Sequence, residues 1–212
     1  MANKKEVAIL FDSSHCTGCK GCQVACKMEN TVALGEGRNK VCTIGPNGTY
    51  PDLEFYFLPT MCQQCENPSC IQVCPTGACY KREEDEVILV DQNLCIGCGS
   101  CRRACPYEMI HPNKELRVSD KCTLCAQLRE VGDTPACVRN CSGGALHYGD
   151  INDPDSEVSK LLAETDPQRI HTLQDFGNGP TTRYILRHDH WVDVLPQDCV
   201  EHSAHRKGGR MA

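Results

Sequence analysis

Cysteine is the residue type through which this chain could do chemistry. It supplies 19 of the 212 residues, about 9%, which is far more than packing alone requires. Sixteen of these cysteines form four groups, and each group opens with C-x-x-C and closes with C-x-x-x-C. This repeated pattern indicates four metal-binding loops. The groups are Cys16, Cys19, Cys22 and Cys26; Cys62, Cys65, Cys70 and Cys74; Cys95, Cys98, Cys101 and Cys105; and Cys122, Cys125, Cys137 and Cys141.

The third group has the spacing of a loop that binds a cubane iron–sulfur cluster. From Cys95 to Pro106 the cysteines follow C-x-x-C-x-x-C-x-x-x-C-P. Such a loop directs three thiolates at three iron atoms, and in two-cluster ferredoxins the cysteine of the C-P pair binds the other cluster. Cys74-Pro75 supplies a second C-P pair. Gly97 and Gly99 fit the close approach of the backbone to a cluster.

Three other uses of so many cysteines fit the sequence less well. A secreted disulfide scaffold is disfavoured by the odd number of cysteines, by a length beyond that of small stapled domains and by an N-terminus without a signal-peptide core. Structural zinc uses two C-x-x-C hooks per tetrahedral site, which leaves the third cysteine of groups one and three unexplained. Redox-active dithiols need one exposed C-x-x-C and give no reason for four.

Short elements must position these loops. Val7–Phe11 and Val87–Val90 predict strands of two-stranded ribbons. Leu124–Val131 and the stretch after Asp155 or Ser156 predict short helices. Glycine and proline in residues 27–61 predict a long irregular insertion between groups one and two. The polar residues 201–211 are expected to form a solvated, mobile tail.

The composition limits both the core and the partners. Leu, Ile, Val and Phe make up only about a fifth of the chain, so side chains alone fill a small core and inorganic groups are expected to help hold it together. The net charge of −6 and pI near 5.7 offer no general attraction for nucleic acid or an anionic membrane. No apolar run approaches the ~20 residues that span a bilayer. Membrane contact or export is therefore expected through a partner.

The chain resembles the four-cluster iron–sulfur subunit of molybdenum or tungsten oxidoreductases of the dimethyl sulfoxide reductase superfamily. The resemblance covers about residues 6–195. The motifs that carry it are the run from Phe11 to Cys19, the four-residue gap between Cys65 and Cys70, the run Cys74-Pro75-Thr76-Gly77-Ala78, Cys105-Pro106-Tyr107, and the widened fourth group with Pro135-Ala136-Cys137.

The resemblance implies an α+β fold of two fused bacterial-type 2[4Fe–4S] ferredoxin-like modules. The outer module comprises residues 1–61 and 107–150 with the insertion 27–61, the inner module is 62–106, and 151–212 form a C-terminal extension. Ligation would cross between groups, with four [4Fe–4S] clusters. The implied ligand sets are Cys16, Cys19, Cys22 and Cys141; Cys62, Cys65, Cys70 and Cys105; Cys95, Cys98, Cys101 and Cys74; and Cys122, Cys125, Cys137 and Cys26.

A few positions depart from the family or lie outside the four groups. Ser142 follows Cys141 where such chains usually have proline, and its hydroxyl would alter the potential of the adjacent cluster. Cys42, Cys79 and Cys199 belong to no group, and Cys79 is expected to be a small buried hydrophobe. His15 is expected to donate a hydrogen bond that tunes a cluster, and His147 to lie in a strand.

No substrate site is recognisable in the sequence, which lacks a nucleophile elbow, a phosphate loop and paired histidines and carboxylates. The expected function is non-catalytic transfer of single electrons between a molybdopterin catalytic subunit and a membrane anchor, quinone or cytochrome carrier. The subunit is expected at the extracytoplasmic face if it is exported with its partner, and otherwise in the cytoplasm. Two alternatives stay open: a free-standing polyferredoxin, and a subunit of a hydrogenase or formate-lyase complex.

Overall fold

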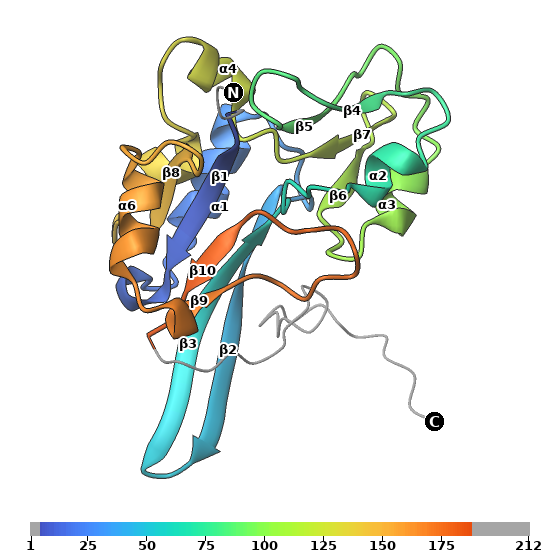
Figure 1. Ribbon diagram of the computed structural model, residues 1–212. Coiled ribbons are helices and arrows are strands. Elements are labelled where there is room, and N and C mark those ends of the chain that lie inside the picture. Colours follow the sequence, from blue (N-terminus) through green and yellow to red (C-terminus); the bar gives the residue numbers. More distant parts are fainter. Residues whose placement is uncertain (1–4, 188–212) are drawn as a thin grey trace, which may run out of the picture.

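The computed structural model describes residues 5–187 and combines short strands with short helices, so the α+β class is as expected. One four-stranded sheet has the order β8-β1-β10-β9, in which β1 is parallel to β10 and antiparallel to β8. Three hairpins, β2–β3, β4–β5 and β6–β7, account for the other strands (Figure 1). The strands are β1 Val7–Asp12, β2 Asn39–Thr49, β3 Asp52–Met61, β4 Cys79–Lys81, β5 Ile88–Val90, β6 Ile110–Asn113, β7 Val118–Lys121, β8 Leu146–Asp150, β9 Ile170–His171 and β10 Arg183–Ile185.

The helices are short, and most begin within or just after a cysteine loop. Only α1 and α6 reach eight residues. The Ser156 side chain caps α6 by accepting a hydrogen bond from the Ser159 N–H at 3.1 Å, so the expected cap and helix are both confirmed. The helices are α1 Gly21–Glu29, α2 Ser69–Gln72, α3 Ser100–Ala104, α4 Ala126–Glu130, α5 Ala136–Arg139 and α6 Glu157–Glu164, with 3₁₀ turns η1 Ser13–His15 and η2 Pro167–Arg169.

Both predicted strands form, but only one of them lies in a two-stranded ribbon. Ile88–Val90 pairs with Cys79–Lys81 in a two-stranded ribbon, as predicted. The strand at Val7–Asp12 instead lies inside the four-stranded sheet, so the prediction of a two-stranded ribbon there is wrong. Its five apolar residues are all buried because neighbouring strands flank it on both sides. His147 lies in β8, as predicted.

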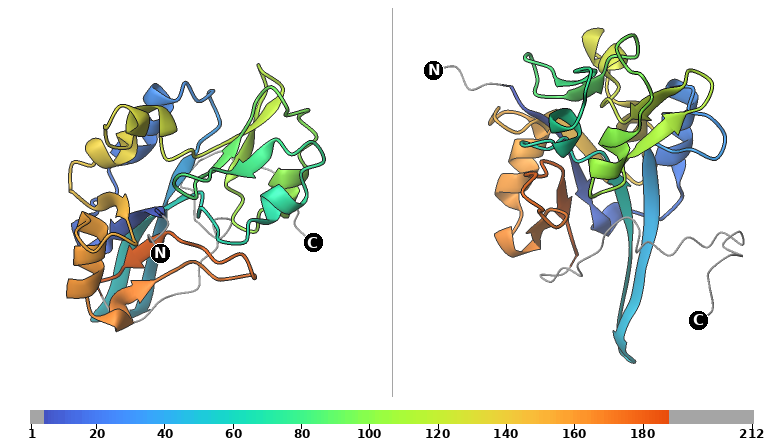
Figure 2. Two further views of the ribbon diagram at one scale, coloured as in Figure 1. Left: turned by 45° about the horizontal axis from the view of Figure 1, so that its top comes forward. Right: turned by 90° about the vertical axis from the view of Figure 1, so that its right-hand side faces the viewer.

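Residues 39–61 form a long hairpin, so the prediction of an irregular insertion over 27–61 is wrong for most of that stretch. Strands β2 and β3 pair from Asn39 with Met61 to Thr49 with Asp52, and the register shifts between Ile44 and Asn47. The hairpin extends away from the body as an arm (Figures 1 and 2). Both strands have an open edge, where proline is tolerated, so the prolines that indicate a loop in sequence terms do not prevent pairing.

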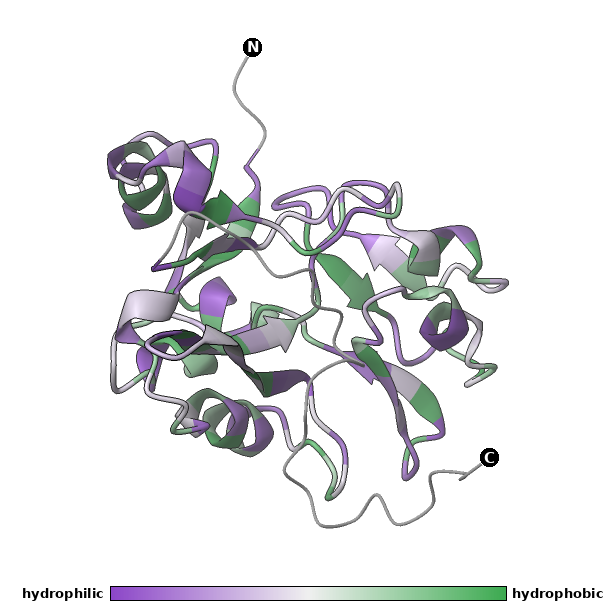
Figure 3. Ribbon diagram, turned by 90° about the horizontal axis from the view of Figure 1, so that it is seen from below, coloured by the Kyte–Doolittle hydropathy of each residue, from purple (hydrophilic) through white to green (hydrophobic). Residues whose placement is uncertain are grey.

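The interior is built around thiols. One main cluster of buried residues joins large side chains such as Phe11, Leu58, Tyr107 and Tyr184 to cysteines from all four groups. Apolar residues gather along the strands, while the helices carry both apolar and polar residues (Figure 3). This agrees with a composition too poor in large apolar residues to fill the core.

The segment after the fourth cysteine group crosses the molecule and is part of its core. Strand β10 inserts between β1 and β9. The loop before it is tied to the second cysteine group, because the Thr181 N–H donates to Gln63 O at 2.9 Å and the Glu66 N–H to Gly179 O at 2.7 Å. The Tyr107 hydroxyl donates to Gln174 O at 2.9 Å. The expected tail at 201–211 lies outside the described residues.

Candidate iron–sulfur centres

Each cysteine group is a curled loop followed by a helix. In group one, Cys16 and Cys19 lie in the loop, and α1 places Cys22 and Cys26 on its buried face, four residues apart. The helices α2, α3 and α5 carry Cys70, Cys101 and Cys137 in the same way. The fourth cysteine of each group therefore lies about one helical turn from the third, on the way out of the loop.

Two glycines that have no room for a side chain show how tightly the cysteine loops pack against their neighbours. Gly97 has φ of +67°, and a Cβ atom there would lie 2.2 Å from Arg117 O. Gly143 has no room for a side chain either, because its Cβ would lie 2.3 Å from His15 O. The close neighbour of Gly97 is backbone from the β6–β7 hairpin, and its approach to a cluster stays a prediction. Gly143 places the end of group four directly against the start of group one.

Groups one and four meet around two cavities. One cavity is lined by Cys16, Cys19 and Cys22 with Cys141 from the other group. We call these four residues the Cys16 set. Burial raises the pKa of Cys22 to about 11, with further contributions from the negative charges of Cys141 and Cys16. Three thiols of one loop and one of another thus surround a common space.

The second cavity is lined by Cys122, Cys125 and Cys137 with Cys26 from group one. We call these four residues the Cys122 set. Burial raises the pKa of Cys26 to about 12, and Cys122 adds to that rise while the Arg38 charge opposes it. The pKa of Cys137 is raised by burial and then by Cys122 and Cys26. This cavity has three thiols from group four and one from group one, whereas the first cavity has three from group one and one from group four.

Groups two and three meet in the same reciprocal way. Burial raises the pKa of Cys65 to about 12, followed by the charges of Cys62, Cys105 and Cys70, so Cys105 of group three lies among the thiols of group two. We call these four residues the Cys62 set.

The remaining four thiols, which we call the Cys95 set, are Cys74, Cys95, Cys98 and Cys101. Ser100 lowers the pKa of Cys98, against the charges of Cys101 and Cys74. The Ser119 N–H donates to Cys95 Sγ at 3.4 Å, and its hydroxyl lies 3.3 Å from Cys101 Sγ, so one residue links two of these thiols.

Thiols of one set affect the pKa of thiols in another. The charge of Cys22 contributes to the raised pKa of Cys137, after larger effects of burial and of the Cys122 set itself, which links the Cys16 and Cys122 sets. The charge of Cys62 likewise raises the pKa of Cys122, after burial. Cys101 has a smaller effect on the pKa of Cys70. These effects on the thiol pKa values link the Cys16 set to the Cys122 set, the Cys122 set to the Cys62 set and the Cys62 set to the Cys95 set.

The donor sets suit a cluster of several irons better than one ion. Within residues 5–187, no group of three or more His, Cys, Asp or Glu side chains converges closely enough to hold a single metal ion. In the Cys16 and Cys122 sets the four thiols surround a cavity, as the four corners of a cubane require. Backbone N–H groups also point at these sulfurs, as expected around an iron–sulfur cluster. They are those of Gly21 to Cys19, Cys79 to Cys74, Ser119 to Cys95, Leu124 to Cys122 and Ala145 to Cys141, at 3.2 to 3.5 Å.

The cysteines outside the groups have separate roles. Cys79 is 3% exposed, as expected, and its thiol forms a hydrogen bond with Cys101 that raises the Cys79 pKa. Cys42 is disulfide-bonded and is not a spare free thiol. Cys199 lies outside the described residues.

Sequence reasoning missed one neighbour of the thiols. The Asn30 side chain lies 3.7 Å from both Cys26 Sγ and Cys125 Sγ, and Arg38 donates to its oxygen at 2.8 Å. The signal available in the sequence is that Asn30 follows Cys26 by four residues, about one helical turn. His15 lines the cavity of the Cys16 set, and its Nδ1 lies 3.4 Å from Asp12 Oδ2. Its expected hydrogen bond to a cluster stays a prediction.

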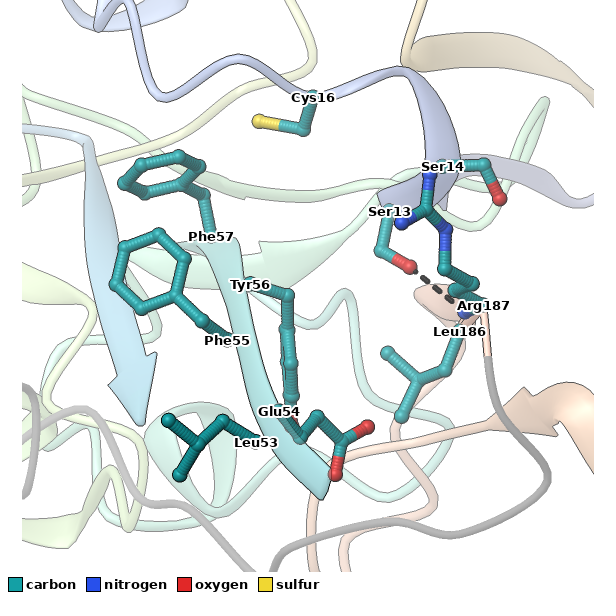
Figure 4. A pocket seen from close by; sticks show the side chains of 10 residues that line it. All are labelled: Ser13, Ser14, Cys16, Leu53, Glu54, Phe55, Tyr56, Phe57, Leu186 and Arg187. Carbon is teal, nitrogen blue, oxygen red and sulfur yellow. Dashed lines mark hydrogen bonds between the residues drawn. The ribbon is translucent and has the colours of Figure 1, made fainter. Parts of the chain in front are cut away.

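A surface pocket adjoins the Cys16 set along strand β3 of the arm (Figure 4). Its volume is about 260 Å³, and Cys16, Phe55 and Phe57 are among the residues that line it. The Phe55 and Phe57 rings pack edge to face with centroids 5.1 Å apart. Leu53 and Phe55 are each about half exposed, so this end of the molecule presents apolar surface next to a thiol set.

Comparisons with known proteins agree with this site. Residues 53–151 match the family model described as a 4Fe-4S dicluster domain. The B subunit of tetrathionate reductase from Salmonella typhimurium is 40% identical, over 89% of this chain and 75% of that protein. The B subunit of sulfite dehydrogenase from Allochromatium vinosum is 35% identical over 91% and 88%, and the thiosulfate reductase electron transfer subunit PhsB of Salmonella typhi is 36% identical over 87% and 94%.

The fold and the thiol sets define a ferredoxin-like protein that binds [4Fe–4S] clusters. The chain belongs to the family of iron–sulfur subunits of the dimethyl sulfoxide reductase type of oxidoreductase. Within residues 5–187, no helix is long and apolar enough to cross a membrane.

Proposed function

We propose that this chain is an electron-transfer subunit that relays single electrons through four [4Fe–4S] clusters, one in each thiol set. The observation that carries the proposal is that each cavity between groups one and four is lined by three thiols of one group and one of the other. The chemistry supplied by each bound cluster is reversible one-electron transfer. The thiols hold the irons, and the surrounding N–H groups stabilise the negative charge of the sulfurs.

The pairing of groups favours two fused modules. Groups one and four would form the outer module, 1–61 and 107–150, and groups two and three the inner module, 62–106. In Figure 1, α2, α3 and the β4–β5 hairpin lie on one side and α1, β1 and β8 on the other, which supports this division. The β6–β7 hairpin, residues 110–121, lies beside α2 and α3 although the division counts it with the outer module. The insertion then contains the arm. Strand β10 pairs with β1 of the outer module, and the Thr181 N–H donates to Gln63 O of the inner module, so the segment 181–185 contacts both.

The row of sets indicates where electrons would enter and leave. Cys19, in the first set of the row, and Cys98, in the last, are exposed, whereas the other described cysteines are buried or partly buried. A terminal cluster near the surface can exchange electrons with a partner, while interior clusters exchange with one another. The exposed apolar surface of the arm beside the Cys16 set supports a protein partner at that end.

The partner at one end would be a molybdopterin catalytic subunit, since the relatives are named as B subunits of oxidoreductases. The other end would face a membrane anchor or another redox carrier. The complex would then be membrane-associated through its partners, at the extracytoplasmic face if the two subunits are exported together. Substrate chemistry would reside wholly in the catalytic subunit.

The test is anaerobic purification of the chain from its native source with whatever subunit accompanies it. About sixteen irons and as many sulfides per chain are expected, with four signals in a redox titration followed by electron paramagnetic resonance. Zinc in place of iron, or fewer than about ten irons in intact material, would refute the four-cluster proposal. Recovery of the chain alone would favour a free-standing polyferredoxin, and a nickel-containing or formate-lyase partner would favour the third alternative.

A further inference from the structure

Lys121 is a buried lysine at the end of β7, immediately before Cys122. Its side chain is only 1% exposed. Its ammonium group donates to Cys122 O at 2.8 Å and also to Ile88 O, so the side chain points into the protein and is fixed at its tip. Strand β7 pairs with β6 through Lys121 and Ile110, which fixes the backbone as well.

The charge of Lys121 has no carboxylate to compensate it within residues 5–187. The neighbouring Asp120 is occupied by Arg38, with distances of 2.8 and 3.0 Å, and by His111 at 3.1 Å. Among the ion pairs of the described residues, none involves Lys121. Burial of an unpaired charge is costly, so a buried lysine indicates an anion nearby.

The groups that face Lys121 are thiols of the two interior sets. Burial raises the pKa of Cys105 and of Cys122, and the Lys121 charge opposes the rise at both. It acts the same way on Cys70, whose pKa is raised by burial and by Cys62. Cys70 and Cys105 belong to the Cys62 set and Cys122 to the Cys122 set, so Lys121 lies where these two sets meet.

We infer that Lys121 is the shared counter-ion of the two interior clusters and keeps both of their reduction potentials above the values they would otherwise have. The inference rests on the proposed ligand sets. Each cluster gains one electron and one negative charge on reduction, with no proton required. A fixed positive charge in a buried region stabilises the reduced form more than the oxidised form, with little screening by solvent. The interior of the row would then accept electrons readily from either end.

The experiment is a redox titration of the anaerobically purified complex with Lys121→Met, followed by electron paramagnetic resonance. Signals are assigned to sets with Cys105→Ser and Cys137→Ser. The two interior clusters should fall in potential by at least 59 mV, a tenfold change in the one-electron equilibrium constant, while the end clusters move much less. Lys121→Arg keeps the positive charge, so both interior potentials should stay close to those of the wild type.

The matched control is Lys81→Met. Lys81 also donates to a backbone carbonyl, that of Glu66 at 3.1 Å, but it is paired with Glu86 at 2.9 Å and is about one-fifth exposed. Its loss should leave all four potentials unchanged. An equal shift of all four clusters in Lys121→Met, or no shift in material with full iron, would overturn the inference while leaving the proposed function intact.

A second variant keeps the test decisive if Lys121→Met does not assemble. The Gln64 side chain contacts the same two residues as Lys121, donating to Cys122 O at 3.3 Å and accepting from Ile88 N at 2.9 Å. Gln64→Glu places a carboxylate of nearly the same shape beside the ammonium group. It should lower the same two potentials, and unchanged potentials would overturn the inference. If the wild-type complex itself showed no iron–sulfur signals, that result would instead contradict the proposed function.

Discussion

The hydroxyl oxygen of Ser142 lies 3.6 Å from Cys19 Sγ, although the two residues belong to different cysteine groups. Under the proposed ligation the Cys19 thiolate would carry no proton, so the hydroxyl would be the donor in this contact. The Gly21 N–H and then Ser142 lower the pKa of Cys19, which agrees with donors that stabilise negative charge on this sulfur. The serine that replaces the usual proline therefore acts on Cys19 and not only on the adjacent Cys141.

Ser142→Ala should lower the reduction potential of the cluster in the Cys16 set. Loss of one hydrogen bond of ~1 kcal/mol corresponds to about 40 mV for a one-electron couple. The measurement is the redox titration of that cluster, and Ser142→Thr, which keeps the hydroxyl, is the control. A rise in potential would mean that the hydroxyl stabilises the oxidised cluster.

Cys105→Ser should damage the cluster of the Cys62 set and spare that of the Cys95 set. Cys105 contributes to the raised pKa of Cys65 and Cys70, so its thiolate lies among theirs. Iron analysis and electron paramagnetic resonance should show one altered or missing cluster, a loss of up to about four irons. Loss of the Cys95-set signal instead would refute the crossed ligand sets.

Cys79→Ala should leave iron content and electron transfer near wild type. Cys79 contacts Cys101 through a hydrogen bond but belongs to no set, so its loss removes a small buried side chain at a cost of ~1 kcal/mol. Cys65→Ala is the matched change at a proposed ligand. In that variant the relay should be interrupted, while turnover at the catalytic subunit with an artificial electron donor or acceptor survives. Loss of that turnover in an assembled complex would place this chain in the active site.

Asp85→Asn should destabilise the contact between the β4–β5 turn and α4 by about 3 kcal/mol, because it leaves the Arg129 side chain, which is 5% exposed, without its carboxylate. Arg82 would keep only the exposed Glu130 and Glu84. Burial acts to raise the pKa of Asp85, but Arg82 and Arg129 hold it at about 2. The folded pKa is below the ordinary value near 4, so this stabilisation is complete above about pH 4 and is lost as the pH falls toward 2.

The measurement for Asp85 is anaerobic urea unfolding of the cluster-loaded protein, followed by circular dichroism. The comparison is made at pH 7, because the sulfide of an iron–sulfur cluster is lost in acid, and the wild type should be more stable than Asp85→Asn by about 3 kcal/mol. Glu84→Gln, at a side chain that is 77% exposed, is the control and should change little. Equal stability of wild type and Asp85→Asn would show that this carboxylate does not stabilise the contact.

Removal of iron by a chelator should unfold the chain cooperatively. The main buried cluster includes cysteines from all four groups, so loss of the clusters removes the centre of the core. Circular dichroism and small-angle scattering before and after chelation would measure the change. An apoprotein that stays compact and structured would show that the side chains suffice.

The sequence by itself determined the local chemistry. A loop such as Cys95 to Cys101 brings three thiols together within seven residues, so its spacing alone predicts a cluster site. The same holds for the buried strand at Val7–Asp12 and for the helix capped by Ser156, because a run of apolar residues and a capping side chain act over short distances.

Only the tertiary structure decided the relationships between distant segments. Ser142 contacts Cys19, Lys121 lies between two thiol sets, and residues 39–61 pair as an arm, yet none of these is encoded within one loop. Proline and glycine favour a loop locally, and long-range strand pairing overrides that preference. The order of the sets and their electrostatic neighbours likewise depend on how the chain returns through space, which residue spacing does not specify.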